Sequence, residues 1–452
     1  MATPLVTPRA GARVVEAIRR EARPLTGAAG DYDALLDLIG DARVVLLGEA
    51  SHGTHEFYRE RARITKRLIA EHGFTAVAVE GDWPDGQRVN RYVRGAGSDA
   101  DAEEALRGYR RFPAWMWRNA DVLDFVGWLR SHNEDRPPGA PAAGFYGLDL
   151  YSLGASMEAV IDYLDAVDPT AAQRARGRYE CLQPFTGEST AYGEAVLLGV
   201  SRSCRRQVIE QLVELRRAAG ARMAADGVAA EDEEFVAEHN AVVVANAEEY
   251  YRTMFGDRAA SWNLRDRHMA DTLDHLMAHL DRHDGRSRVV VWEHNSHIGD
   301  ARRTEMSARG ELNVGQLARE RHGGDAVLVG FTTATGTVTA ATDWGGLAER
   351  KRVRQPLPES YEAVMQAAGI PAFLLCGLAG GRLGRALREP RLERAIGVIY
   401  RPETERASHY FKANLAEQFD ALVHVDVTRA LEPLERERAW EREPPETYPT
   451  AL

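Results

Sequence analysis

The chain has 452 residues, of which 44% are hydrophobic and 28% are charged, and its formal net charge is −11. This length allows a large core and about three domains, and the composition is ordinary for a globular protein. The acidic balance argues against a nucleic-acid partner, because it repels phosphate backbones. No apolar run is long enough to cross a membrane, so no membrane partner is expected.

Cysteine usage and the N-terminus indicate the compartment. Cys181, Cys204 and Cys376 are an odd number without CxxC spacing, which argues against a disulfide framework and against a thiolate zinc site. The N-terminal segment lacks the apolar core of a signal peptide. We therefore predict a cytoplasmic protein.

The first third of the chain alternates helix and strand. Amphipathic patterns predict helices over 10–22, 31–39 and 54–73, the last ending at Gly73, and short apolar runs predict strands over 43–49, 75–83 and 144–150. A strand, a helix and a second strand within about forty residues form a βαβ unit, which implies a parallel sheet.

Strand signals fade in the middle of the chain and then return. Residues 151–285 show helical patterns, and strands are expected over 288–294, 326–341 (a hairpin around Gly336), 372–378, 395–400 and 421–427. We predict an α/β fold with a mainly parallel central sheet flanked by helices and a large helical insertion. Its parts are a first α/β half of the catalytic core (1–150), the insertion (151–285), a second α/β half (286–430) and a charged, Pro-rich tail (431–452).

Ionisable side chains follow four of the predicted strands. They are Glu49 and His52 after the first strand, Glu80 after the second, Asp149 after the third, and His294 and His297 after the fourth. In open α/β sheets the binding crevice lies beyond the carboxyl ends of the strands, so these residues are predicted to share one polar site. For Asp149 taken alone, a capping or loop role is favoured.

The residue types of this cluster suggest acid–base chemistry. A histidine beside a carboxylate acts as a general base, and Glu49 lies three residues before His52. The helix that begins after His52 favours developing negative charge at its N-terminus. His294 and His297 are suited to donate to an oxyanion. Together these features suit attack of water on an acyl carbon.

Several catalytic and nucleotide-binding motifs are absent from the sequence, which reduces the number of enzyme classes to consider. The chain has no G-x-S-x-G elbow, no phosphate-binding P-loop, no dinucleotide-binding glycine motif after a strand and no H-E-x-x-H. Two glutamates and three histidines could instead hold zinc or manganese, and this alternative stays open. His275, His279 and His283 recur every four residues on a predicted helix, for which a solvated helix face is favoured over a metal stripe.

Three longer stretches carry a family resemblance. At "LLGEASHGTHEF" (46–57), "VAVEGDWPD" (77–85) and "VVVWEHNSHIGDAR" (289–302) the chain resembles the erythromycin esterase family, and the resemblance runs nearly the full length. It implies an α/β core with a helical insertion and a deep cleft, and hydrolysis of an ester, which in the namesakes is the macrolactone of an antibiotic. Members of a broad branch are also labelled succinoglycan biosynthesis proteins.

The resemblance also implies roles for single residues. His52 matches the proposed general base, Glu49 and Glu80 match acids that orient the base and the water, and His294 and His297 match histidines of the same cleft. Arg61, Asp149 and Trp83 are predicted substrate contacts, and neither metal nor other cofactor is expected.

The sequence therefore predicts a carboxylic ester hydrolase that acts on a macrolide or on another natural-product ester or lactone. Among the namesakes of the family, this activity has a role in antibiotic resistance. The alternatives are a metal-dependent hydrolase with the same cluster and a ligand-binding homologue without catalysis. The sequence does not indicate the oligomeric state.

Overall fold

The structure is a computed structural model, and it describes residues 8–226, 228–436 and 440. The chain divides into two compact units. Unit 1 comprises residues 1–77, 93–143 and 288–452, and unit 2 comprises residues 78–92 and 144–287. The expected α/β class with a mainly parallel sheet, flanking helices and a long helical segment is confirmed.

The sheet of unit 1 has a parallel centre. Strand β2 (Val44–Leu47) pairs in parallel with β5 (Val289–Trp292) and with β6 (Ala326–Ala340), and β6 pairs in parallel with β11 (Ala421–Thr428). Three further strands are antiparallel: β8 (Ala372–Cys376) on β11, β1 (Arg23–Pro24) on β8, and β7 (Glu349–Val353) on β6. The strand order is thus β1-β8-β11-β6-β2-β5 in this unit.

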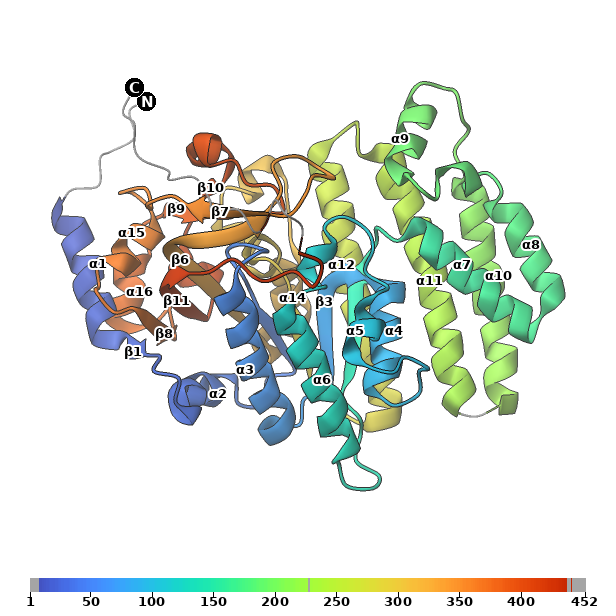
Figure 1. Cartoon of the computed structure of the whole chain (residues 1–452), viewed down its shortest axis with the longest axis horizontal. Coiled ribbons are helices and arrows are strands. Elements are labelled where there is room, and N and C mark those ends of the chain that lie inside the picture. Colours follow the sequence, from blue (N-terminus) through green and yellow to red (C-terminus); the bar gives the residue numbers. More distant parts are fainter. Residues whose placement is uncertain (1–7, 227, 437–439, 441–452) are drawn as a thin grey trace. The chain divides into compact units, whose positions relative to one another are not determined.

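Helices surround these strands (Figure 1). The longer ones are α1 (Pro8–Glu21), α2 (Asp33–Ile39), α3 (His55–His72), α6 (Ala120–Glu134), α14 (Val314–His322) and α16 (Gly381–Leu387). The shorter ones are α5 (Ala102–Leu106), α13 (Asn295–Ile298), α15 (Tyr361–Gln366), α17 (Glu405–Ser408) and α18 (Leu415–Gln418). Helix α3 ends where expected, because Gly73 takes a left-handed conformation at φ 67°.

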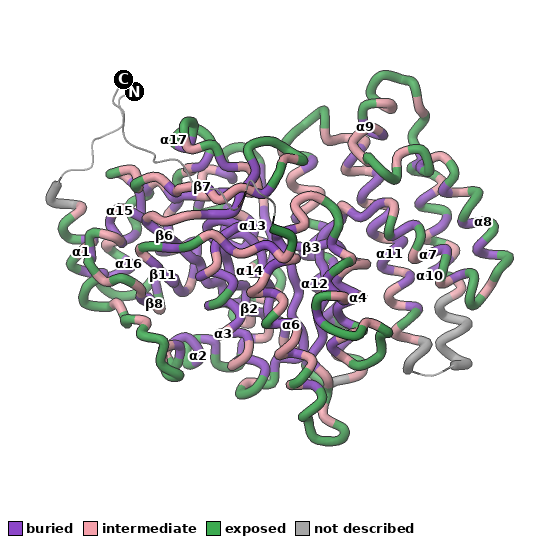
Figure 2. The backbone as a smooth tube through the Cα atoms, in the orientation of Figure 1, coloured by how far each residue is buried: buried purple, intermediate pink, exposed green. Residues whose placement is uncertain are grey.

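The core of unit 1 lies around its central strands. All residues of β2 and β5 are buried, and Figure 2 draws the strand interior in the colour of buried residues. These strands are apolar on both faces because helices cover both sides of a parallel sheet. The consecutive apolar runs at 44–47 and 289–292 are consistent with this burial.

Two strand predictions in the second half of the chain are wrong. The expected hairpin over 326–341 is one continuous strand, β6, whose antiparallel partner β7 was not predicted. The expected strand over 395–400 makes only isolated bridges, through Ile396 and Ile399, and the nearby pairing is β9 (Arg391–Arg394) with β10 (Tyr410–Ala413).

Gly336 explains why β6 looked like a hairpin. It has φ 125°, a conformation that favours glycine, yet it lies within β6 opposite Thr428 of β11. A Cβ atom at this position would lie 1.9 Å from the Thr428 carbonyl oxygen. The glycine therefore allows close approach of two strands and does not reverse the chain.

Unit 2 combines two strands with long helices. Most of β3 (Ala76–Asp82) lies in this unit beside β4 (Gly144–Asp149), together with α4 (Trp83–Val93). The segment that follows forms α7 (Leu153–Val167), α8 (Pro169–Tyr179), α9 (Ser189–Leu197), α10 (Arg205–Asp226), α11 (Val228–Thr253) and α12 (Arg258–Asp284). Helices α10 and α11 run side by side (Figure 1).

A disulfide that the sequence did not predict lies among these helices. Cys181, after α8, is bonded to Cys204, before α10, with their Cα atoms 6.2 Å apart. The pairing depends on the return of the chain around α9, which a count of cysteines does not show. Cys376 is not in a disulfide.

Two other sequence expectations bear on the ends and on membranes. In the described residues, no helix combines the length and the apolar character that crossing a bilayer requires. Most of the predicted tail lies outside the described residues. Its first residue, Leu431, is buried and donates its backbone N–H to Gly53 at 3.0 Å.

Replacing Gly336 with alanine is expected to lower the free energy of unfolding by about 1–3 kcal/mol, because the new Cβ meets the β11 backbone. Urea unfolding measures the change. Gly127→Ala is the matched control: it lies in α6, where an added Cβ would have no atom within 4 Å, so its stability should hold or rise. Equal stability of both variants would contradict the close approach.

Candidate active site

The parallel register of β2 and β5 brings the first and fourth predicted strand ends together. Leu47 pairs with Trp292, so the residues after each strand emerge side by side. The backbone N–H of Asn295 donates to the Glu49 carbonyl oxygen at 2.8 Å. Glu49, His52, His294 and His297, which the sequence predicted to share a site, thus lie at one end of the unit 1 sheet.

The Glu49 carboxylate contacts two other buried side chains, those of His52 and Arg61. Glu49 Oε1 lies 2.8 Å from His52 Nδ1, and Glu49 Oε2 accepts a hydrogen bond of 2.6 Å from Arg61 Nη2. All three residues are buried. Because a carboxylate paired with a guanidinium is an acceptor, a neutral His52 in this geometry carries its proton on Nδ1 and has its lone pair on Nε2.

Arg61 is held by aromatic rings as well as by Glu49. Its guanidinium carbon lies 4.3 Å from the centre of the Tyr58 ring and 5.1 Å from that of Trp292. Arg61 Nε and Nη1 have no hydrogen-bond partner among the described residues, where these ring faces provide the other favourable contacts of the guanidinium. The sequence predicted Arg61 as a substrate contact, and the structure shows in addition a hydrogen bond from Arg61 to Glu49.

Backbone hydrogen bonds fix the loop that carries His52. The Ala50 carbonyl accepts from Ile396 at 2.8 Å, and the Gly53 carbonyl accepts from Thr339 at 2.9 Å. A Cβ on Gly53 would lie 1.8 Å from the Thr339 carbonyl oxygen, so only glycine fits here. This explains the small residues around His52, which let the loop lie against β6.

His294 stands beside His52 in a defined tautomer. The two ring centres are 4.8 Å apart. His294 Nδ1 accepts from the backbone N–H of Ser296 at 3.2 Å and lies 2.8 Å from its hydroxyl. A neutral His294 that accepts at Nδ1 carries its proton on Nε2, which makes that nitrogen a donor. His297 is buried one turn further along α13.

Sequence reasoning missed a buried carboxyl group beside Asn295, the residue that follows His294. Glu393 of β9 is fully buried and accepts from Asn295 Nδ2 at 3.4 Å. Burial, with the nearby carboxylate of Glu362, raises the pKa of Glu393 to about 8. "RLERAI" (391–396) has no motif that marks Glu393, because its surroundings come from distant segments.

In unit 2, an arginine joins the other two strand-end carboxylates. Arg265 of α12 donates to both Asp149 oxygens, at 3.0 and 2.7 Å, and to Glu80 Oε1 at 2.7 Å. Its guanidinium carbon lies 4.9 Å from the centre of the Tyr151 ring. Sequence reasoning did not select Arg265, since nothing in "SWNLRDRHM" (261–269) separates it from its arginine neighbours.

Trp83 begins α4 in the same unit. Its side chain is fully buried, and its ring lies 4.1 Å from that of His239 and 5.8 Å from that of Phe235, centre to centre. The roles of Trp83 and Asp149 as substrate contacts, and the catalytic role of Glu80, stay predictions.

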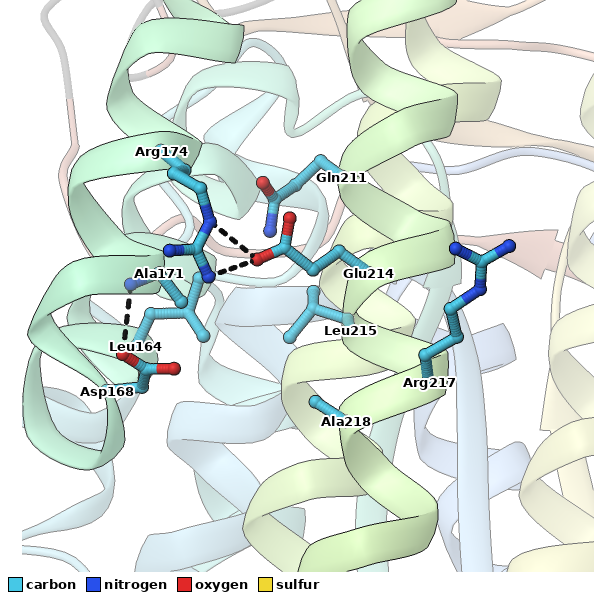
Figure 3. Close-up of a pocket in the computed structure, with 9 residues that line it drawn as sticks. All are labelled: Leu164, Asp168, Ala171, Arg174, Gln211, Glu214, Leu215, Arg217 and Ala218. Carbon is cyan, nitrogen blue, oxygen red and sulfur yellow. Dashed lines mark hydrogen bonds and ion pairs between the residues drawn. The ribbon is translucent and has the colours of Figure 1, made fainter.

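A hollow of about 320 Å³ lies between α8 and α10 in the helical part of unit 2 (Figure 3). Its rim carries Arg174, which donates two hydrogen bonds of 2.9 and 2.6 Å to Glu214. None of the predicted site residues lines it. The hollow therefore adds nothing to the chemistry of the strand ends.

Comparison with known proteins identifies relatives along most of the chain. The family model "Erythromycin esterase" matches residues 69–428, a range that includes Glu80, Asp149, His294 and His297 but begins after Arg61. Erythromycin esterase type II of Escherichia coli is 24% identical over 358 residues, which cover 75% of this chain and 82% of that protein. The putative hydrolase YbfO of Bacillus subtilis is 22% identical, covering 90% of each chain.

Solved structures share the fold. A crystal structure described as a succinoglycan biosynthesis protein aligns with a TM-score of 0.74 at 23% identity, covering 94% of this chain and 99% of that one. A mutant of the erythromycin esterase EreC in its open conformation aligns with a TM-score of 0.65 at 17% identity, covering 90% and 95%.

The raised pKa of Glu393 predicts a pH dependence of stability. The carboxyl of Glu393 has a pKa of 4.5 in the unfolded chain and of about 8 in the folded chain. Its contribution to the free energy of unfolding is therefore fully present below pH 4.5 and is lost as the pH rises toward 8. Each unit of difference is worth about 1.4 kcal/mol. Glu393→Gln should remove this loss, so above pH 8 it should be more stable than the parent protein.

Urea unfolding between pH 5 and pH 9 measures both profiles. Glu389→Gln, at an exposed position on the neighbouring turn, is the control and should follow the parent protein. A Glu393→Gln variant that loses stability with pH as steeply as the parent would contradict the assignment.

Proposed function

Because the chain belongs to the erythromycin esterase family, which suggests ester hydrolase activity, we propose that it hydrolyses a carboxylic ester or lactone by direct attack of water. The observation that carries the proposal is the contact of Glu49 with His52 on one oxygen and with Arg61 on the other. It leaves His52 Nε2 as a base held in one orientation.

In the proposed reaction, His52 Nε2 removes a proton from water as its oxygen attacks the carbonyl carbon. The carbonyl oxygen becomes an oxyanion, and the proton on His294 Nε2 is suited to stabilise it. When the tetrahedral intermediate collapses, the bond to the alcohol oxygen breaks and the His52 imidazolium returns its proton to that oxygen. Acid and alcohol are the products, and no acyl-enzyme forms.

Glu49 and Arg61 support this cycle as positioning residues. Glu49 holds the ring of His52 in one tautomer and stabilises the imidazolium that forms, while Arg61 keeps the carboxylate in place. Glu80 is proposed to orient water, and His297 to assist at the carbonyl oxygen, as the family resemblance implies.

The proposed substrates are natural-product esters and lactones. Macrolides are the first to test, because the Escherichia coli relative carries the name erythromycin esterase type II. Mass spectrometry of a panel of macrolides and simpler esters, incubated with the purified protein, detects the gain of one water. If the protein hydrolyses none of the compounds in the panel, the proposal is contradicted.

His52→Ala is expected to reduce kcat on any turned-over ester by about 10²–10⁴-fold, because the general base is lost. Thermal unfolding checks that the variant is folded. His72→Ala, at the other end of α3, is the control and should retain activity. Full turnover by a folded His52→Ala protein would exclude the mechanism.

His294→Gln is expected to lower kcat by about 10²–10³-fold with a smaller change in KM, because the lost donor acts mainly on the oxyanion. Steady-state kinetics separates the two parameters. A rise in KM with an unchanged kcat would instead assign His294 to ground-state binding of the substrate.

A further inference from the structure

Three side chains whose types commonly ligate metals lie together in unit 2, on two neighbouring helices. His279 and His283 are one turn apart on α12, and Glu231 is on α11. One ligand atom from each of the three residues lies within 4.8 Å of the others. This group contains none of the residues assigned to ester hydrolysis.

The two histidines are held with ring nitrogens toward carboxylates. His283 Nε2 lies 3.6 Å from Glu231 Oε2, and this buried nitrogen has no hydrogen-bond partner in the part of the chain that the structure describes. His279 Nε2 lies 2.7 Å from Asp232 Oδ1. The His279 ring also stacks on Phe235, with ring centres 4.0 Å apart and planes 4° from parallel, which fixes its orientation.

We propose that Glu231, His279 and His283 bind a divalent transition metal, with zinc as the best fit. Two imidazoles and a carboxylate suit zinc, and histidines four residues apart on a helix project from one face. The carboxylate of Asp232 or a water would complete four ligands. Because the ligands come from α11 and α12, the metal would tie these helices together and stabilise unit 2.

Arg282 contacts two of the three proposed ligands. Its Nε donates to Glu231 Oε1 at 2.9 Å, and its Nη2 donates to His279 Nδ1 at 3.1 Å. His279 then carries its proton on Nε2, facing Asp232. Metal binding at Nε2 requires this proton to leave, and the half-exposed Arg282 side chain to move into solvent. Arg282 therefore competes with the metal.

This competition gives the proposal a specific signature. The proposed site should bind zinc more tightly in the Arg282→Gln variant. If zinc instead bound non-specifically to surface side chains, its affinity should change little in this variant. Affinity should also fall at acidic pH, because protonated histidines do not ligate. The inference goes beyond the proposed hydrolysis and does not depend on it.

The test is calorimetric titration of zinc into the full chain after removal of metals with a chelator, with thermal unfolding in parallel. One equivalent should bind and raise the melting temperature. His279→Ala and His283→Ala should each weaken binding by more than the about 10–100-fold typical of an outer-shell change. His275→Ala, one turn earlier on α12, is the matched control and should bind as the parent protein does.

Absence of zinc binding by the parent protein would overturn the proposal. Zinc binding that both histidine variants retain would also overturn it. If zinc binding is lost only in His52→Ala, the metal lies elsewhere, and the proposal is contradicted in that case too. Circular dichroism without zinc checks each variant. If a histidine variant is unfolded, Glu231→Gln takes its place, with the same loss expected and retention of binding again contradictory.

Discussion

The hydrogen bonds that Glu49 makes with His52 and Arg61 are the interaction on which the candidate site depends. All three groups are buried, so each needs its partner: breaking such a pair costs about 3–5 kcal/mol through the charge left behind. The Tyr58 and Trp292 rings flank the guanidinium. The carboxylate is thereby available to His52 at 2.8 Å in one fixed orientation.

The fold of unit 1 makes this arrangement possible through its backbone. Parallel pairing of β2 with β5 places the Glu49 carbonyl against the Asn295 N–H, and β6 extends far enough for Thr339 to bind the loop at Gly53. A hairpin over 326–341 would have ended this strand before Thr339. The strand that was wrongly predicted as a hairpin is therefore the one that supports the loop of His52.

Local patterns predicted much of the fold and of the site, since apolar runs, helix stops and polar strand ends are visible in short stretches. They yielded β2, α3, β3, β4, β5 and the pairing of Glu49 with His52. Features that arise from distant contacts escaped them. Arg265 and Glu393 resemble their neighbours in sequence, and their hydrogen-bond partners are carboxylates or an amide 98 to 185 positions away. The Cys181–Cys204 bond likewise depends on how helices return.

The position of the proton on His52 is the most direct test of the account. Long-range ¹⁵N–¹H correlation spectra of histidine-labelled protein distinguish the two tautomers, and a His52→Asn variant assigns the signals. The account predicts a neutral His52 with its proton on Nδ1, hydrogen-bonded to Glu49, and a bare Nε2. A proton on Nε2 in the neutral ring would contradict it, because that nitrogen could then accept no proton from water.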